Sequence, residues 1–137
     1  MNTSLIIEEF ASSWAYTRKM TNEFIKCVPK EKWDFSHHPK FGPLSQQFRH
    51  MVGVYGCYID AFISRKMDLS KKKAYFSEPL NRENILSVLG QMDLKLKGVL
   101  NEIKNEDLNK FTVDFFGQSM GFTEYSHVLI QHECSHF

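Results

Sequence analysis

Apolar side chains recur every three or four residues along most of this 137-residue chain, and this period constrains its fold more than any other feature. Side chains at that spacing share one face of an α-helix, whereas those of a strand alternate at every second residue. The period predicts helices over about 3–27, from 44 or 45 to about 66, from 81 to about 104, and from 123 onwards. The sequence therefore predicts an all-α protein, a single antiparallel four-helix bundle over residues 1–137.

Helix-breaking and polar stretches separate these segments. Three of the four prolines lie between residues 29 and 43, which predicts a loop there. Residues 66–80 are polar, and Asn81 is suited to cap the third helix. The pattern turns irregular over 105–120, where residues 111–117 alternate enough to predict a short extended piece. The second helix is apolar nearly all round, so we expect it at the centre of the bundle.

Composition narrows the class of partner and the compartment. The net charge is +1, and apart from three consecutive lysines at 71–73 there is no basic stripe, which argues against nucleic acid. Three cysteines without a Cys-x-x-Cys pair indicate neither a disulfide framework nor a zinc knuckle, and fit a reducing compartment. No signal peptide and no apolar run of roughly 18 residues is visible. We therefore expect a soluble, cytoplasmic protein that does not enter a membrane.

Two histidines near the carboxyl end stand four residues apart on the fourth predicted helix. His132 and His136 share a face with Tyr125, Val128 and Leu129, so both imidazoles project from the apolar side of that helix. Imidazoles that face a core need partners for their ring nitrogens, and a shared metal ion satisfies one nitrogen on each. The alternative is a surface coincidence of two histidines at helical spacing.

His50 supplies a third ligand for the same ion. It lies in the middle of the second helix, on a face with Val54, Cys57 and Ala61 that leaves volume beside the ring. Bundle proteins build metal sites from inward side chains of facing helices. The sequence therefore predicts a divalent metal on His50, His132 and His136, with a further coordination position open to water or substrate. The alternative interpretation is that His50 is a hydrogen-bonded core residue, as a lone histidine at such a position usually is.

The other histidines and cysteines fit this site less well. His37 and His38 fall in the proline-rich loop and read as solvated, and His127 lies about 140° round the helix from His132. Cys57 follows His50 by seven residues and shares its side of the helix, but a small buried apolar residue is the simpler interpretation. Cys134 lies off the face of its neighbours, which indicates a structural or incidental residue.

Residues 132–136 also match His-Glu-x-x-His, the zinc protease signature in which the glutamate is the general base. Such proteases take their third ligand from residues downstream of the motif, and here Phe137 is the last residue. They also need a strand edge that aligns the peptide substrate. Glu133 is about 100° round the helix from His132, so we expect it to point away from the metal. A metallohydrolase is therefore the weaker hypothesis.

The chain resembles the DinB/YfiT-like family of metalloenzymes. The resemblance rests on a first helix of about 25 residues, a proline-rich loop, the segment PLSQQFRHMVGVYGCYIDAF with one histidine, and the final FTEYSHVLIQHECSHF with His-x-x-x-His. It spans the whole chain in element order and ligand spacing. It implies a four-helix bundle with a metal on His50, His132 and His136. Members usually continue for a few helical turns beyond the last histidine, so the fourth helix is expected to be shortened here.

The resemblance also implies an activity. Its better understood members are often dimeric, and are transferases or isomerases that use bacillithiol, mycothiol or glutathione. For this chain it implies a homodimer that joins a low-molecular-weight thiol to a small electrophile. Zinc or nickel suits imidazole ligands, and iron or manganese is compatible. Another class of function stays open, a metal-binding or dimerising bundle without turnover.

Overall fold

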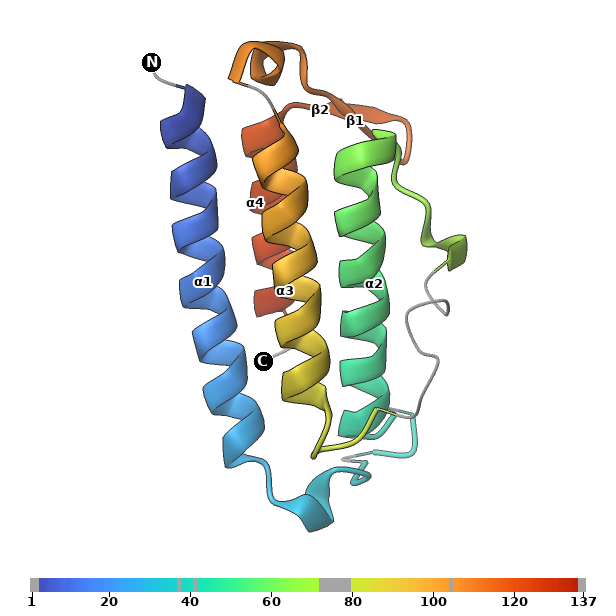
Figure 1. The fold of residues 1–137 in the computed structure, drawn as a ribbon. Helices are drawn as coiled ribbons and strands as arrows, with labels where there is room; N and C mark the ends of the chain where they lie inside the picture. The colour runs from blue at the N-terminus through green and yellow to red at the C-terminus, as the bar shows by residue number, and fades with distance from the viewer. Residues whose placement is uncertain (1–2, 37, 41, 72–79, 104, 136–137) are drawn as a thin grey trace.

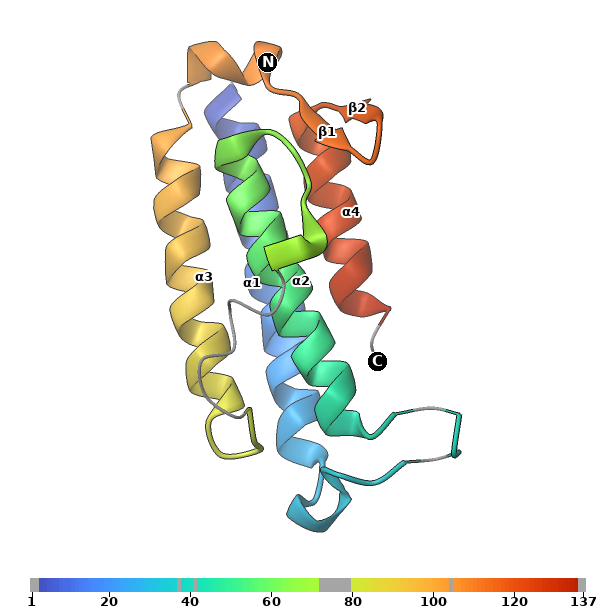
Figure 2. The ribbon, with the colours of Figure 1, turned by 90° about the vertical axis from the view of Figure 1, so that its right-hand side faces the viewer.

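The computed structural model describes residues 3–36, 38–40, 42–71, 80–103 and 105–135, and it is built from four long helices. The helices are α1 (Thr3–Cys27), α2 (Leu44–Ser64), α3 (Ile85–Glu102) and α4 (Phe122–Cys134). They pack side by side as a bundle (Figures 1 and 2). The predicted all-α bundle is confirmed. The shorter elements include the 3-10 helices η1 (Lys30–Lys32) and η3 (Asn105–Lys110) and the strands β1 (Val113–Phe115) and β2 (Gln118–Met120).

The helix directions are mixed. Figure 1 shows α1 and α4 running one way along the bundle, and α2 and α3 running the other way. Of the helix pairs in close contact, α1 with α3 and α2 with α4 are therefore antiparallel, whereas α1 runs parallel to α4 and α2 runs parallel to α3. The reason is the connection over residues 65–84, which returns the chain from the end of α2 to the opposite end of the bundle. Four-helix bundles with one long crossover have this arrangement.

The third helix starts later than the sequence predicted. It begins at Ile85, and Asn84 rather than Asn81 occupies the cap position. The two asparagines hold a turn in front of it, because each backbone N–H donates to the other's side-chain oxygen at 2.8 Å. Asparagine side chains form such local turns in competition with the helix. The predicted end at Lys104 lies outside the described residues, and the helix ends at Glu102.

The extended piece predicted over residues 111–117 forms one strand of a hairpin whose second strand was not predicted. β1 and β2 pair antiparallel, with Phe115 opposite Gln118. The two turn residues, Phe116 and Gly117, have φ angles of 55° and 92°, as the tightest hairpin turns require. The carboxylate of Asp114 accepts the Gly117 N–H at 2.8 Å, which offsets the strain of a left-handed phenylalanine. Figure 2 shows the hairpin beside the last turn of α2 and the first turn of α4.

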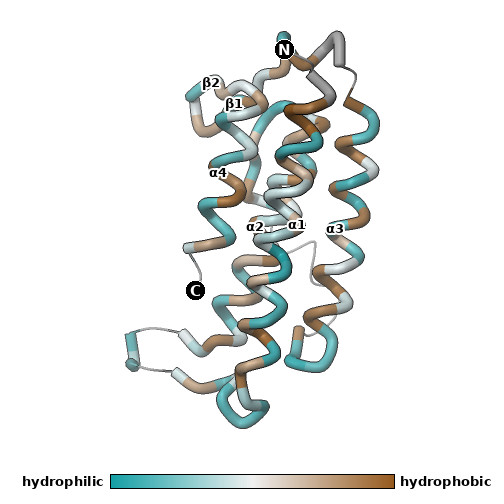
Figure 3. Tube along the Cα trace, turned by 90° about the vertical axis from the view of Figure 1, so that its left-hand side faces the viewer, coloured by the Kyte–Doolittle hydropathy of each residue, from teal (hydrophilic) through white to brown (hydrophobic). Residues whose placement is uncertain are grey.

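Aromatic and aliphatic side chains from all four helices fill the interior. Figure 3 shows the apolar positions recurring along each helix. One cluster of buried residues surrounds Phe62 of α2, and a second surrounds Phe48 near the opposite end of the same helix. α2 has 13 buried residues, more than any other helix has among the described residues, in agreement with its nearly all-apolar sequence. None of the described helices is long and apolar enough to cross a bilayer.

Candidate metal centre

The structure brings His50 and His132 together. His50 lies in the second turn of α2 and His132 in the last turn of α4, where the two helices run antiparallel. Their ring centres are 5.9 Å apart, with the ring planes at 52°. His132 is half-buried and His50 is exposed, so the pair lies at the edge of the bundle. Two histidines that are 82 positions apart in the sequence thus meet at one point on its surface.

The separation of these rings suits a shared ion. An ion bonded to an imidazole nitrogen at about 2.0–2.1 Å lies roughly 3.2 Å from that ring's centre, so two rings on one ion have centres no more than about 6.4 Å apart. The observed 5.9 Å falls inside that limit. His136, the third predicted ligand, lies outside the described residues. Within the described part of the chain, no group of three or more histidine, cysteine or acidic side chains is placed to hold a metal ion.

Aromatic rings enclose His132 on its core side. The centre of the Tyr58 ring lies 5.7 Å from that of His132, and the Tyr125 ring packs against Tyr58 at 5.4 Å with a tilt of 32°. The Tyr125 hydroxyl donates to the Tyr58 carbonyl at 2.7 Å, which ties α4 to α2 beside the histidines. Burial raises the pKa of Tyr58 to about 12, so its hydroxyl stays protonated at neutral pH. The sequence pattern presented Tyr58 only as a core residue, and its place beside His132 depends on the packing of α4.

Glu133 points away from the histidine pair, as expected, but it is not on the surface. Its side chain is fully buried between α4 and α1. Arg18 forms an ion pair with it, and the Thr21 hydroxyl donates to the same carboxylate oxygen at 2.9 Å. A general base of the His-Glu-x-x-His type must face the ion's open position. Here Arg18 and Thr21 hold the carboxylate on the α1 side, which argues against the protease hypothesis.

A buried polar network extends from this ion pair across the bundle. Asp93 of α3 accepts hydrogen bonds from Arg18 at 2.8 Å, from the Trp14 indole N–H at 3.0 Å and from the Tyr55 hydroxyl at 2.7 Å. Burial alone lowers the pKa of Arg18, but Glu133 and Asp93 raise it by a larger amount, so the guanidinium stays charged. The network therefore ties all four helices together at one level.

Sequence reasoning missed this network. The available signal was Arg18 on the apolar stripe of the first helix, four residues after Trp14 and three before Thr21. A charge on a core-facing stripe requires an oppositely charged partner. The partner was not identifiable, because Glu133 follows 115 residues later.

The remaining histidines and cysteines lie elsewhere. His38 is exposed in the loop after α1, and His37 is outside the described residues. His127 is exposed on α4 and lines a shallow cleft against α1, as its angular position predicted. Cys57 is buried in the core, and Cys134 is exposed.

Comparison with known proteins gives two findings. Residues 13–137 match the model of the DinB superfamily. The fold is similar to the crystal structure of YjoA, a DinB-like protein from Bacillus subtilis, with a TM-score of 0.69 and 13% sequence identity over 93% of this chain and 83% of that one. At this identity the likeness is one of fold. No curated protein matches the chain.

Proposed function

This chain belongs to the DinB superfamily, and we propose that it is a metal-dependent enzyme of that superfamily whose ion is held by His50, His132 and His136. The observation that supports the proposal is the approach of the His50 and His132 rings to 5.9 Å from two different helices. His136 follows His132 by one helical turn and is proposed as the third ligand from its spacing alone.

The donor set suits a chemistry that needs a strong Lewis acid. A divalent ion bound by neutral imidazoles keeps its full charge, and so lowers the pKa of a thiol or water that binds to it. Zinc or nickel fits these ligands best, and iron or manganese is compatible. We propose a low-molecular-weight thiol as cosubstrate and a small electrophile as its acceptor.

The chain's own residues would orient the site and limit access to it. The Tyr58 ring packs 5.7 Å from the half-buried His132 ring and would restrict the orientation of that ligand. The exposure of His50 leaves an approach from solvent. Tyr58 keeps its proton at neutral pH, so it adds no charge beside the ligands. The site therefore has an aromatic wall on the Tyr58 side and access from solvent on the His50 side, which suits a small organic substrate.

Metal content is the first test. Protein purified without a chelator should carry about one transition-metal ion per chain. His50→Ala and His132→Ala should each reduce the metal content to below ~0.1 ion per chain, because removal of any one of three ligands disrupts the coordination of the ion. Elemental analysis by mass spectrometry measures the content. His127→Ala is the matched control, because it removes an exposed histidine from the same helix as His132. Wild-type protein without metal, or equal metal in all variants, contradicts the site.

Thiol conjugation is the second test. Metal-loaded protein should accelerate the reaction of bacillithiol, mycothiol or glutathione with a test electrophile, and His132→Ala should lower the rate at least about 100-fold, since Lewis-acid stabilisation is worth several kcal/mol. Stopped-flow absorbance with each thiol in turn measures it. A chelated sample restored by zinc or nickel is the control. Metal bound at the three histidines without conjugation of any thiol would identify a non-catalytic metal-binding bundle instead.

A further inference from the structure

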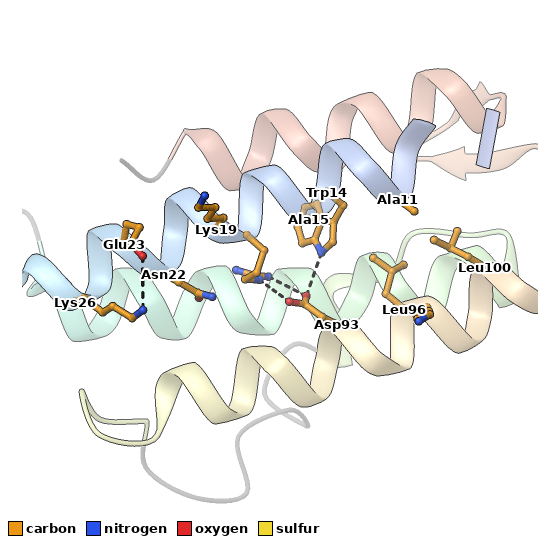
Figure 4. Close-up of a pocket in the computed structure, with 12 residues that line it drawn as sticks. Ala11, Trp14, Ala15, Lys19, Asn22, Glu23, Lys26, Asp93, Leu96 and Leu100 are labelled. Atoms are coloured by element: carbon orange, nitrogen blue, oxygen red, sulfur yellow. Dashed lines mark hydrogen bonds and ion pairs between the residues drawn. The ribbon is translucent and has the colours of Figure 1, made fainter. Parts of the chain in front are cut away.

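The hydroxyl group of Tyr58 differs from those of the other buried tyrosines. Three tyrosines are buried among the described residues, Tyr55, Tyr58 and Tyr125. The Tyr55 hydroxyl donates to Asp93 at 2.7 Å, and Asp93 also accepts from Trp14 (Figure 4). The Tyr125 hydroxyl donates to the Tyr58 carbonyl at 2.7 Å, whereas the Tyr58 hydroxyl makes no hydrogen bond within the described part of the chain. Buried tyrosine hydroxyls usually have a partner, so that of Tyr58 is available to a bound molecule.

This hydroxyl reaches the surface although the rest of the residue does not. Tyr58 is 3% exposed. Its oxygen is nevertheless not one of the fully enclosed polar atoms that lack a partner, so the small exposed area of the residue includes the hydroxyl. A molecule that arrives from solvent can therefore accept a hydrogen bond from Tyr58 without displacing an acceptor of the protein.

The packing directs the Tyr58 side chain toward the histidines. Side chains of a helix lean toward its N-terminus, and His50 precedes Tyr58 by about two turns of α2. The centre of the Tyr58 ring is 5.7 Å from that of His132, which in turn is 5.9 Å from that of His50. Phe115 and Tyr125 pack against other parts of the Tyr58 ring, with centres at 6.0 and 5.4 Å. The accessible hydroxyl therefore belongs to the side where the histidine rings meet.

A neutral hydroxyl beside a site that activates a thiol favours one class of electrophile. Its strongest hydrogen bond goes to an oxygen that gains negative charge during the reaction. When a thiol adds to an α,β-unsaturated carbonyl compound, its proton leaves to solvent and its sulfur bonds to the β-carbon. The electrons of the C=C bond move toward the carbonyl oxygen, which carries the negative charge until the α-carbon takes a proton from water. Displacement of a halide places the charge on the halide and on no oxygen.

We propose that the Tyr58 hydroxyl donates a hydrogen bond to the carbonyl oxygen of an α,β-unsaturated substrate, which makes Tyr58 a catalytic residue of the histidine site. The inference rests on the proposed function, because it names the electrophile that the thiol attacks. The hydroxyl keeps its proton throughout and acts only as a donor. Phe115 and Tyr125 hold the ring in position before the substrate arrives, as electrostatic stabilisation requires.

Tyr58→Phe removes the donor and keeps the ring. In metal-loaded protein the conjugation of benzylideneacetone, an enone, should slow about 100-fold, the usual effect of losing one donor to a developing oxyanion. Conjugation of benzyl chloride should change by no more than about twofold, because no oxygen becomes negative. Tyr125→Phe is the matched control and should keep the wild-type ratio of the two rates, since its hydroxyl is engaged within the protein. An equal loss with both electrophiles, or no loss with the enone, overturns the proposal.

Infrared difference spectroscopy tests the hydrogen bond without turnover. Benzylacetone has the same carbonyl group but no C=C bond to which a thiol can add. When it is bound to the protein as purified, its carbonyl stretching band should lie at a lower wavenumber in wild type than in Tyr58→Phe, because a hydrogen bond weakens the C=O bond. Isotopic labelling of the carbonyl carbon separates this band from the amide bands. The same wavenumber in both proteins, or no binding of benzylacetone, overturns the proposal. Wild-type protein that shows the shift but conjugates no thiol contradicts the proposed function and supports Tyr58 as the carbonyl donor.

Urea unfolding shows whether the hydroxyl has a structural role instead. Tyr58→Phe should keep the wild-type midpoint, because no described residue loses a partner. Tyr125→Phe should lower the midpoint, because the Tyr58 carbonyl loses a donor. Metal content should equal that of wild type in both variants. A Tyr58→Phe variant that is destabilised as much as Tyr125→Phe overturns the proposal, since the hydroxyl would then bond within the protein.

Discussion

Replacing Arg18 with methionine is expected to lower the free energy of unfolding by about 3–5 kcal/mol, because removal of one partner of a buried ion pair leaves the other charge uncompensated. Glu133 would remain fully buried with Thr21 as its only recorded hydrogen-bond donor among the described residues. Methionine keeps most of the volume of the arginine stem, so little of the effect would come from a cavity. Urea unfolding followed by circular dichroism measures the change.

Two further variants distinguish the effect of breaking the ion pair from the effect of removing a positive charge. Lys19→Met removes an exposed cation from the next position of α1 and should change stability by no more than about 0.5 kcal/mol. The double variant Arg18→Met with Glu133→Leu should recover about 2 kcal/mol or more, because no buried charge is then left at residue 133. A single variant as stable as wild type, or a double variant less stable than the single one, contradicts the assigned role.

The same variant should show a distinct dependence on pH. Burial raises the pKa of Glu133 above its ordinary value of 4.5, and Arg18 pulls it down. Without Arg18 the pKa rises further. A carboxyl group with a raised pKa stabilises the fold fully below its unfolded pKa, and this stabilisation is lost as pH rises through the folded pKa. The destabilisation by Arg18→Met should therefore be smallest near about pH 4 and grow toward neutral pH. If the difference in free energy of unfolding between Arg18→Met and wild type stays constant across this pH range, Glu133 does not titrate in this way.

Phe62→Ala is expected to cost about 3–5 kcal/mol, the usual range for loss of a fully buried aromatic side chain. Phe62 is 1% exposed at the end of α2, where the hairpin and α4 meet it. Its ring centre lies 4.9–6.1 Å from four others, those of Phe10, Phe111, Phe122 and Tyr125. Truncation would leave a cavity shared by α1, α2, α4 and the segment before β1, so no single element can move in to fill it. Chemical denaturation measures the loss.

The neighbouring residue is a matched control for this prediction. Ile63 follows Phe62 directly on α2 and is 61% exposed. Ile63→Ala should change stability by no more than about 0.5 kcal/mol, because it removes a side chain that water already surrounds. Similar losses at the two positions would mean that the aromatic cluster does not anchor this end of the bundle.

The sequence determined the elements of the fold. The helical period of the apolar residues predicted α1 with its observed bounds, Thr3–Cys27, and placed α2 at the centre of the bundle. The hairpin was predicted only in part. Its turn places Phe116 in the left-handed region, and phenylalanine has no preference for that conformation, so the sequence does not indicate a turn there. The late start of α3 is also a local feature: Asn81 and Asn84 bond to each other across a turn, and the regular helix begins only after that turn, at Ile85.

The histidine pair was also visible in the sequence. His50 and His132 stand on helix faces whose neighbours are core residues, and a bundle has few places where two such faces can meet. The prediction that they converge agrees with their separation of 5.9 Å. Binding of a metal by them, and the part of His136, remain predictions.

Only the tertiary structure decided which helix covers which face, and in which direction. The period of a helix fixes where its side chains point, but not the neighbour they meet, because the connection over residues 65–84 is compatible with more than one path. For the same reason the sequence placed Glu133 off the histidine face without revealing its buried ion pair. A carboxylate is buried only where a cation compensates it, and Arg18 reaches Glu133 only after α1 and α4 have packed side by side.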